Sequence, residues 1–506
     1  MTDSARGGVL TEDYRQSLSL LRRVSNAQDS EDVVIHEFRA LGRDAALLYV
    51  DGFAGEDKMQ RFLLQPLLSS PAPNGDTPLD DYLIREALPL CSLRATAHVS
   101  SALSAVFSGD AALIMDGMPG ALIADVKCFA HRAPAQPVNE SVVMGPHEGF
   151  NESIRDNTVM IRRMLPTPDL ISEGMQIGDQ MPVRVCLMYL RGAAKEETVA
   201  RVRRRLSLCR VDTVSSLGML EQLIEDHPFS LLPQCVATER PDRAASFLNE
   251  GQIVLVMDNS PAVLALPVSF WHLFHAPDDT ALRWPYGVFL RLLRLAGLLI
   301  ALLLPGLFIC LTAYHPEGMS LSLLTSVMES QERVPFSLFA STLLMLLVFS
   351  LISEAGARVP GAMGSSVSIV GGLILGQAAV QADLISPLVI IVVAVSGLGS
   401  YASPSFPLTL SLRILQLALV ILSGLAGLPG LTLGVFAILL HLCGLSSLGV
   451  PYLSPKAPRR QANPDQTLRA PVWRLRLRGM LSSPLGMQRV SFGPMRAWER
   501  EEKHDR

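Results

Sequence analysis

Apolar residues are distributed unevenly along this chain of 506 residues. Residues 1–285 alternate short apolar runs with polar stretches, as globular domains do, whereas residues 286–453 hold long apolar runs with few charges. Residues 454–506 are polar and basic. Because a helix needs about 20 mostly apolar residues to cross the hydrocarbon core of a bilayer, this pattern predicts a globular front half, a helical membrane domain and a basic tail.

The front half contains two pairs of similar segments. SGDAALIMDGMPGALIADV (Ser108–Val126) aligns at a constant offset with EGQIVLVMDNSPAVLALPV (Glu250–Val268), with Gly, Asp and Pro in register. Each segment is typical of a strand, a polar turn and a second strand. AALLYVDGFAGE (Ala45–Glu56) similarly matches VCLMYLRGAAKE (Val185–Glu196), where an apolar run ends at Gly and an amphipathic helix follows. That succession is typical of the opening of an α/β unit.

The fold class that follows is α/β, with a helical membrane domain behind it. We predict two duplicated cytoplasmic α/β subdomains, residues 30–145 and 165–285, in which the helical stretches DYLIREAL and RAASFLNE precede the repeated strands. An N-terminal extension, residues 1–29, comes before them, and a linker helix motif, residues 146–164, lies between them.

Few positions of the front half suggest chemistry. Gly52 and Gly192 belong to neither a GxxxxGKS nor a GxGxxG motif, so we interpret them as strand-to-helix turns. Asp116 and Asp258 fall in the two hairpin turns, where Asp is favoured because its side chain bonds to nearby backbone. The seven cysteines include no CxxC pair and the histidines no HExxH spacing, which argues against a zinc site or a disulfide framework. We therefore expect no catalytic residue, cofactor or metal, and no enzyme.

The membrane half divides into six predicted spans. Arg291 and Arg294 lie at the start of the first span and are expected to reach the membrane interface. The last apolar run breaks at Gly427-Leu-Pro-Gly430 and is therefore counted as two spans. The spans cover about residues 288–313, 336–353, 365–382, 384–401, 408–427 and 429–445.

Positive charge predicts the orientation of these spans. The tail, residues 454–506, holds Lys456, Arg459 and further arginines, and cytoplasmic segments carry an excess of Lys and Arg. Six spans place this tail and the N-terminus on the same, cytoplasmic side. The N-terminal residues lack the pattern of a signal peptide, which also favours a cytoplasmic front half.

Small residues crowd the third and fourth predicted spans. Gly372 and Gly376 form a GxxxG motif, which in lipid is typical of closely packed helices. Glu354, Arg358 and Gln377 lie in or beside the same region. Two interpretations are open: these polar residues line a pore or gate, or Glu354 and Arg358 mark a membrane edge and pair at i,i+4 spacing.

Four segments resemble the signature sequences of the A subunits of GerA-type spore germinant receptors. They are GPHEGFNESIRDNTVMIRRMLPTPDL, TERPDRAASFLNEG, EAGARVPGAMGSSVSIVGGLILGQAAV and HLCGLSSLGVPYLSPKAP, and the resemblance extends over about residues 30–480. Met164 departs from the basic residue that the family usually has there. The matching motif positions imply either a contact between subunits or domains, or a solvated structural helix: Asn151, Arg155, Asn157, Arg162, Arg163, Glu239 and Arg240.

The resemblance also implies a function. Such A subunits lie in the inner membrane of the spore, act with a permease-like B subunit and a lipoprotein C subunit, and are thought to form homo-oligomers with an ion-conducting path. The alternative within the family is the stage V sporulation AF accessory protein. The segment VMDNSPAVLALPVSFWHLFHAPDD resembles that protein more, whereas PVWRLRLRGM resembles the receptor subunit more. Two alternatives lie outside this family. One is a secondary transporter, although the sequence has no clear inverted repeat. The other is a membrane scaffold that does not conduct ions. No nucleic-acid partner is expected.

Overall fold

The computed structural model describes most of the chain in two compact units. The first holds the residues up to Pro228 together with Cys235–Val268, and the second holds Phe229–Gln234 and Ser269–Leu477. Most of the predicted third span, residues 365–382, and most of the basic tail lie outside the described residues. Those described are 8–71, 78–90, 92–128, 136–137, 140, 142, 144–276, 278–358, 372, 376–459, 465, 467–475 and 478.

The first unit contains two five-stranded sheets with the same strand order, β1-β2-β4-β5-β3 and β6-β7-β9-β10-β8. The duplication predicted from the sequence is therefore confirmed. Every described ladder is antiparallel, so the two subdomains are built from hairpins rather than from parallel βαβ units. The strands are β1 (Val33–Ala40), β2 (Arg43–Val50), β3 (Leu93–Thr96), β4 (Ala111–Met115), β5 (Ala121–Ala124), β6 (Leu170–Ile177), β7 (Val183–Leu190), β8 (Val236–Thr238), β9 (Ile253–Met257) and β10 (Val263–Leu266).

The two repeated hairpins agree residue by residue. β9 and β10 begin and end at the positions that the sequence alignment assigns to the ends of β4 and β5. Gly117 has φ +80° in the first turn, and Asn259, at the equivalent position of the second turn, has φ +60°. Gly and Asn are the residues that adopt this left-handed conformation most readily. The shared turn thus fixes the register of both hairpins.

The helices extend the duplication beyond the segments that are similar in sequence. α2 (Tyr14–Val24) and α7 (Ile154–Met164) have the same length, and each comes directly before the first hairpin of its sheet. The predicted N-terminal extension and linker helix are therefore the first helices of the two repeats, which begin before residues 30 and 165. α6 (Val99–Val106), and not DYLIREAL, is the counterpart of α10 (Pro241–Asn249), in which RAASFLN lies.

The remaining helices of the first unit differ between the repeats. The second repeat has α8 (Glu196–Leu208) and α9 (Leu217–Ile224). The first has a series of short helical segments in their place: α3 (Glu56–Met59), η1 (Gln60–Leu64), α4 (Gln65–Ser69), α5 (Leu79–Tyr82) and η2 (Leu83–Ala87). Both faces of the first sheet are buried, because alternate residues of a strand point to opposite faces. Ala45 and Leu47 of β2 pack with the helices from α3 to η2, and Leu48 packs with α2 and α6.

The second unit is mainly helical. Three of its described helices are long and apolar enough to cross a membrane, at residues 284–314, 338–356 and 406–444. A fourth, α16, is apolar but has only 15 residues. The count of six spans therefore stays a prediction. The elements are η3 (Phe270–Phe274), α11 (Asp278–Ala281), α12 (Trp284–Ile309), η4 (Cys310–Tyr314), η5 (Pro316–Gly318), α13 (Leu321–Glu332), α14 (Leu338–Arg358), α16 (Pro387–Tyr401), α17 (Phe406–Gly444), β11 (Ser446–Ser447), β12 (Val450–Pro451) and η6 (Val472–Arg474).

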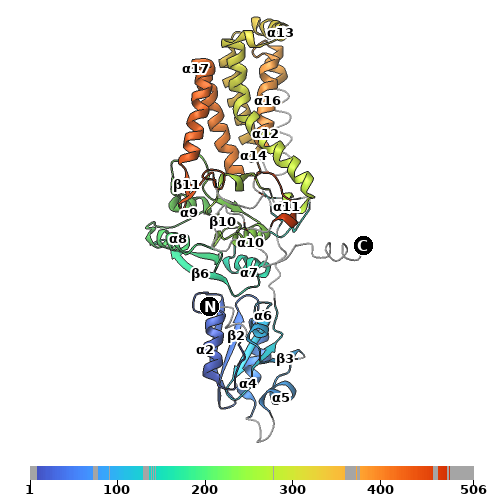
Figure 1. Ribbon diagram of the computed structural model, residues 1–506, viewed down its shortest axis with the longest axis vertical. Helices are drawn as coiled ribbons and strands as arrows, with labels where there is room; N and C mark the ends of the chain where they lie inside the picture. The colour runs from blue at the N-terminus through green and yellow to red at the C-terminus, as the bar shows by residue number, and fades with distance from the viewer. Residues whose placement is uncertain are drawn as a thin grey trace, which may run out of the picture. The chain divides into compact units, whose positions relative to one another are not determined.

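α17 is a helical hairpin that turns at the predicted break. Gly427 has φ 62° and ψ −141°, a conformation outside the helical region. A straight helix would separate Leu419 from Gly434 by about 22 Å. Instead, a Cβ at Gly434 would lie 2.5 Å from Leu419 Cδ2, so the two legs pack side by side (Figure 1). The sequence LPG therefore divides this run into two antiparallel helices.

The first arginines of α12 are held by an ion pair within the chain. Both Arg291 and Arg294 are largely buried and pair with Asp279, and their position at the membrane interface stays a prediction. Arg291 also donates to Asp465 at 2.6 Å. The buried carboxylate of Asp279 is close to both arginines in the sequence. A guanidinium can be buried when it is paired with such a carboxylate.

Candidate functional site

The site that gathers most of the family-motif positions is built on α7. Ser153 caps its N-terminus, the hydroxyl accepting from the Asp156 backbone N–H at 3.3 Å. Asp156 lies in the first turn and Arg162 and Arg163 in the last, which complements the helix dipole. The buried residues of the helix are Asn157, Ile161 and Arg162, so its buried side is largely polar. Local sequence therefore specifies a short, well-capped helix whose arginines project from its C-terminal end.

Two asparagines tie the start of α7 to the second sheet. The side chain of Asn157 is fully buried; its Oδ1 accepts from Asn151 N–H at 2.9 Å, and its Nδ2 donates to Asn151 O at 2.6 Å. Nδ2 also approaches Ser260 O at 3.4 Å in the β9–β10 turn. Asp258 of the same turn accepts from Ile154 N–H at 3.3 Å. Asp258 thus bonds to the start of α7 as well as occupying a hairpin turn.

The opposite side of α7 contacts the first subdomain. Arg155 Nη2 donates to Asp51 Oδ1 at 2.6 Å and to Glu56 Oε1 at 2.7 Å. Hydrogen bonding to Glu56 raises the pKa of Arg155 above its usual value. Val159, one turn further along, lies so close to Gly52 that a Cβ on that glycine would overlap its side chain. The Gly52 turn is therefore a packing surface for α7.

Arg162 is the most buried charge of the junction. Its guanidinium, fully buried, pairs with both oxygens of Asp32, Nη2 donating to Oδ1 at 2.8 Å. The same nitrogen donates to Leu170 O at 2.9 Å, and the guanidinium carbon stands 5.5 Å from the centre of the Phe107 ring. Burial raises the pKa of the Asp32 carboxyl, and Arg162 counteracts the shift by favouring the carboxylate. Asp32 directly precedes β1, so this pair joins the two repeats.

The neighbouring Arg163 has a different environment. It pairs with Glu148, and both side chains are about one-third exposed. A pair in that position is screened by water and contributes little to stability. Of the two adjacent arginines in the motif, Arg162 is part of the junction and Arg163 remains at its surface.

Glu239 and Arg240 lie on the second subdomain, at the start of α10. Arg240 is almost fully buried, and its guanidinium pairs with Asp242, Nη2 to Oδ2 at 2.7 Å. The Glu140 carboxylate accepts from Glu239 N–H at 3.2 Å, and the Glu239 carbonyl accepts from Phe150 N–H at 2.8 Å. These two motif residues therefore hold the segment that leads into α7 against the second sheet.

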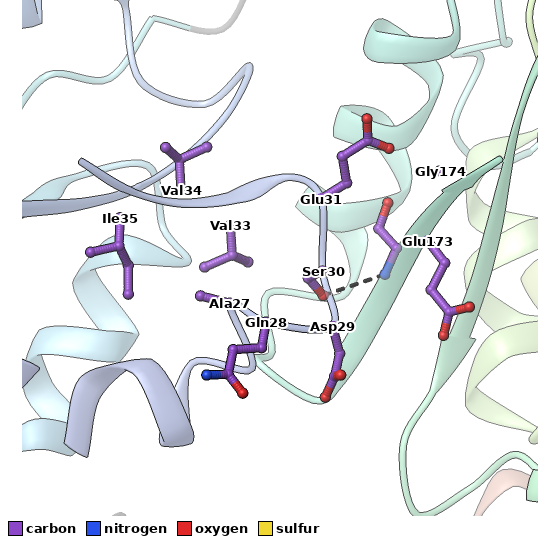
Figure 2. Close-up of a pocket in the computed structure, with 11 residues that line it drawn as sticks. Ala27, Gln28, Asp29, Ser30, Glu31, Val33, Val34, Ile35, Glu173 and Gly174 are labelled. Carbon is purple, nitrogen blue, oxygen red and sulfur yellow. Dashed lines mark hydrogen bonds between the residues drawn. The ribbon is translucent and has the colours of Figure 1, made fainter. Parts of the chain in front are cut away.

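The junction also has an open groove. Figure 2 shows it, with residues Ala27–Glu31 and Val33–Ile35 on one side and Ser172–Gly174 on the other. Its volume is about 490 Å³. Glu31 N–H donates to Ser172 O at 2.9 Å, and Arg184 pairs with the Glu31 carboxylate at 2.7 Å. Because the acidic groups of its wall are paired with arginines, we interpret the groove as part of the contact between the repeats.

The arginines could be identified from the sequence, but their partners, Asp32, Asp51 and Glu56, could not. The sequence nevertheless contains a pattern that relates the two helices. The arginines of α2, at positions 15, 22 and 23, have the same spacing as those of α7, at positions 155, 162 and 163. In the first repeat Arg22 pairs with Glu37 of the neighbouring β1, whereas Arg162 reaches into the preceding repeat.

The candidate pore residues lie in the other unit, in and after α14. Glu354 and Gln377 are exposed. A Cβ on Gly372 or Gly376 would meet no described atom within 4 Å. Arg358 ends α14, and its side chain lies outside the described part of the structure. The predicted pairing of Glu354 with Arg358 and the pore both stay predictions.

Comparison with known proteins identifies the family. A family model described as Bacillus/Clostridium GerA spore germination protein matches residues 21–480. The chain belongs to this GerA family. Spore germination protein KA of Bacillus subtilis (strain 168) is 34% identical over 448 residues, 88% of this chain and 82% of that protein. Spore germination protein B1 of the same organism is 32% identical over 476 residues, 94% and 98% of the two chains.

Two further comparisons concern a third spore germination protein and a solved receptor domain. Spore germination protein GerLA of Bacillus cereus is 32% identical over 429 residues, covering 84% of this chain and 87% of that protein. The crystal structure of the N-terminal domain of the A subunit of the Bacillus megaterium spore germinant receptor GerK3 is 30% identical, with a TM-score of 0.42, over 52% of this chain and 98% of that one. The match to the GerA family model includes α7 and the helices of the second unit up to η6, so both halves of this chain are shared with the family.

Proposed function

We propose that this protein is the A subunit of a spore nutrient-germinant receptor in the inner membrane of the spore. The observation that carries the proposal is the similarity to spore germination proteins along both units, 94% of the chain in one relative. In this role it assembles with a permease-like B subunit and a lipoprotein C subunit. Its two termini lie in the cytoplasm, with the duplicated front half facing the interior of the spore.

The proposal includes an oligomeric ion-conducting path. It is supported by Gly372 and Gly376, because an added Cβ at either position would meet no described atom within 4 Å, and such small residues allow close contact with a neighbouring helix. Glu354 and Gln377 are exposed and offer polar groups that a lipid environment disfavours unless they face water or protein. The path therefore involves α14 and the helix that holds Gly376.

The second candidate is a stage V sporulation AF-type accessory protein, a membrane scaffold or channel partner. It is favoured by the segment VMDNSPAVLALPVSFWHLFHAPDD, which continues from β9 through η3. An accessory protein would change the rate of germination with every nutrient, whereas a receptor subunit would remove the response to one nutrient class and leave others intact.

Deletion of the gene in the spore-forming host separates these functions. We expect spores that lose the response to particular nutrients but still germinate when the dipicolinate store is released chemically. Affinity purification of the tagged chain from spores should recover a permease-like and a lipoprotein partner. Purified protein in vesicles then tests conduction directly: cation flux supports a channel, substrate counterflow a transporter, and neither a scaffold. A slower response to all nutrients would contradict the receptor role.

A topology reporter tests the orientation. Fused after Pro458, it should read as cytoplasmic, as should one fused at the N-terminus. An external signal at Pro458 with a cytoplasmic N-terminus would require an odd number of spans and contradict the six-span arrangement.

A further inference from the structure

A thiol and two carboxylates meet in the second repeat, away from the α7 junction. Glu221 of α9, Glu225 at its C-terminus and Cys235 just before β8 have ligand atoms that all lie within 4.8 Å of one another. Residues four apart on a helix share one side, so the two carboxyl groups point to the same place. The Cys235 backbone N–H donates to Glu221, which holds the strand side of the cluster against the helix.

Cys235 is buried, with 6% of its surface exposed. Its thiol makes no hydrogen bond to any residue that the structure describes. In the same repeat the other buried thiol, Cys186, has a hydroxyl partner, Ser172 Oγ at 3.0 Å. A buried polar atom without a hydrogen bond requires an explanation, and this sulfur lies within 4.8 Å of two carboxylate oxygens.

The charges around the cluster are predominantly negative. Burial, and then the charges of Glu221, Glu225 and Asp226, raise the pKa of the Cys235 thiol, while Arg205 acts in the opposite direction. Arg205 is itself engaged, with Nη2 donating to Asp226 Oδ1 at 2.5 Å. Burial, with the neighbouring Glu225 carboxylate as the next cause, raises the pKa of Glu221 to about 8. Bringing such groups together is unfavourable unless a proton or a cation compensates them.

The first repeat shows that the fold does not require the cluster. The alignment of the two repeated hairpins places Leu93, the first residue of β3, at the position of Cys235, and Leu93 packs against the apolar core. One copy of the duplicated unit thus has an ordinary hydrophobic side chain where the other has a thiol beside two carboxylates.

We propose that Glu221, Glu225 and Cys235 bind one divalent transition-metal ion of the zinc class. One thiolate and two carboxylates are ligands that zinc accepts, with water in the remaining position, whereas magnesium and calcium disfavour sulfur. The ligand atoms must draw together slightly, because atoms bound to one tetrahedral zinc at about 2.0–2.3 Å lie closer to each other than 4.8 Å. Binding forms a metal–sulfur bond and metal–oxygen bonds and releases the protons held by Cys235 and Glu221.

The test is cobalt titration of the full-length protein, purified in detergent and stripped with a chelator. Co²⁺ bound to a thiolate gives a charge-transfer absorption band. We expect the band to saturate at one ion per chain, to disappear when Zn²⁺ is added, and to be absent in Cys235→Ser. The matched variant Cys186→Ser, at the other buried thiol of the repeat, should keep the band. Glu221→Gln and Glu225→Gln should require more Co²⁺ for saturation.

Absence of the band in the wild-type protein would overturn the proposal, and this outcome does not depend on any variant folding. A band that persists in Cys235→Ser would also overturn it, since an exposed thiol such as Cys128 or Cys443 would then be the ligand. Unaltered saturation in both Glu variants would remove the carboxylates from the site. None of these results bears on germination, so the receptor role is tested independently.

Discussion

The guanidinium of Arg162, in the last turn of α7, is fully buried against the carboxylate of Asp32, which directly precedes β1. The two residues are separated by 130 positions and belong to different repeats. The equivalent arginine of the first repeat, Arg22, pairs within its own repeat. One helix of a duplicated unit has thus acquired a second role, that of joining the copies.

Removal of Asp32 should loosen this junction. Asp32→Ala leaves the Arg162 guanidinium buried without its carboxylate, and breaking a buried ion pair in this way costs about 3–5 kcal/mol. Hydrogen–deuterium exchange of the full-length protein should show faster exchange in α7 and β1. Arg163→Ala is the control, because its exposed pair contributes about 1 kcal/mol or less. Equal protection of α7 in both variants would contradict a structural role for the Asp32–Arg162 pair.

The two equivalent glycines of the repeats should differ in sensitivity. Gly52 has φ +79° and Gly192 φ +81°, so an alanine at either position is strained by roughly 1 kcal/mol. Only at Gly52 would the new Cβ overlap Val159 of α7; at Gly192 it would meet no described atom within 4 Å.

We therefore expect Gly52→Ala to lower the thermal stability of the purified protein more than Gly192→Ala. It should also increase the cleavage of the chain near α7 by a protease. If Gly192→Ala were equally damaging, the effect would come from the turn conformation alone and not from packing against α7.

The turn of the α17 hairpin should depend on Gly427. Its φ of 62° with ψ −141° belongs to a region that only glycine enters readily, so Gly427→Ala should cost of order 1–3 kcal/mol. Leu419→Cys and Gly434→Cys place thiols on the facing legs, and their cross-linking yield should fall when Gly427→Ala is added. Gly444→Ala is the control, because the new Cβ would meet no described atom within 4 Å and the position has no positive φ. An unchanged yield would show that the hairpin forms without this turn.

Substitutions at two glycines of the second unit should separate helix packing within one chain from helix packing between chains. A Cβ on Gly397 would overlap the ring of Phe349, whereas one on Gly376 would meet no described atom within 4 Å. Gly397→Leu should therefore reduce the amount of folded protein in the membrane. Gly376→Leu should leave that amount unchanged but reduce chemical cross-linking between chains and slow germination.

Variants at Glu354 and Gly376 also test the proposed ion-conducting path. Glu354→Gln should change ion release more than protein level if its carboxylate faces the path. Normal assembly and germination in both Gly376→Leu and Glu354→Gln would favour a scaffold without conduction.

The sequence predicted one part of the repeat and missed another for physical reasons. β4–β5 and β9–β10 could be located because buried strands flank a turn in which Asp and Pro recur, so apolar pattern and turn chemistry agree. α2 and α7 are both apolar at four aligned positions, 14/154, 20/160, 21/161 and 24/164, but the identical residues are the three arginines at matching intervals. Charged residues on helices are usually solvated, so this spacing has little weight until the fold places Arg162 in the interior.

The partners of the motif residues could not be predicted from the chain. Asp32, Asp51 and Glu56 are distant in sequence from α7, and their ion pairs depend on how the two repeats pack. The same applies to Arg291 and Arg294, whose position near an apolar run suggested the membrane interface, although both pair with Asp279 in the folded chain. Segment boundaries follow from local pattern, whereas buried charge requires the tertiary structure.

The hairpin of α17 has a consequence for how the protein enters the membrane during synthesis. A straight helix of 39 residues would be about 58 Å long, nearly twice the hydrocarbon thickness, whereas the folded hairpin has two legs of suitable length. In the six-span arrangement that we propose, the part that must cross the bilayer, Ala426–Leu431, has no charged side chain. In that arrangement both legs enter the membrane together, and no charged group of the following basic tail has to be translocated.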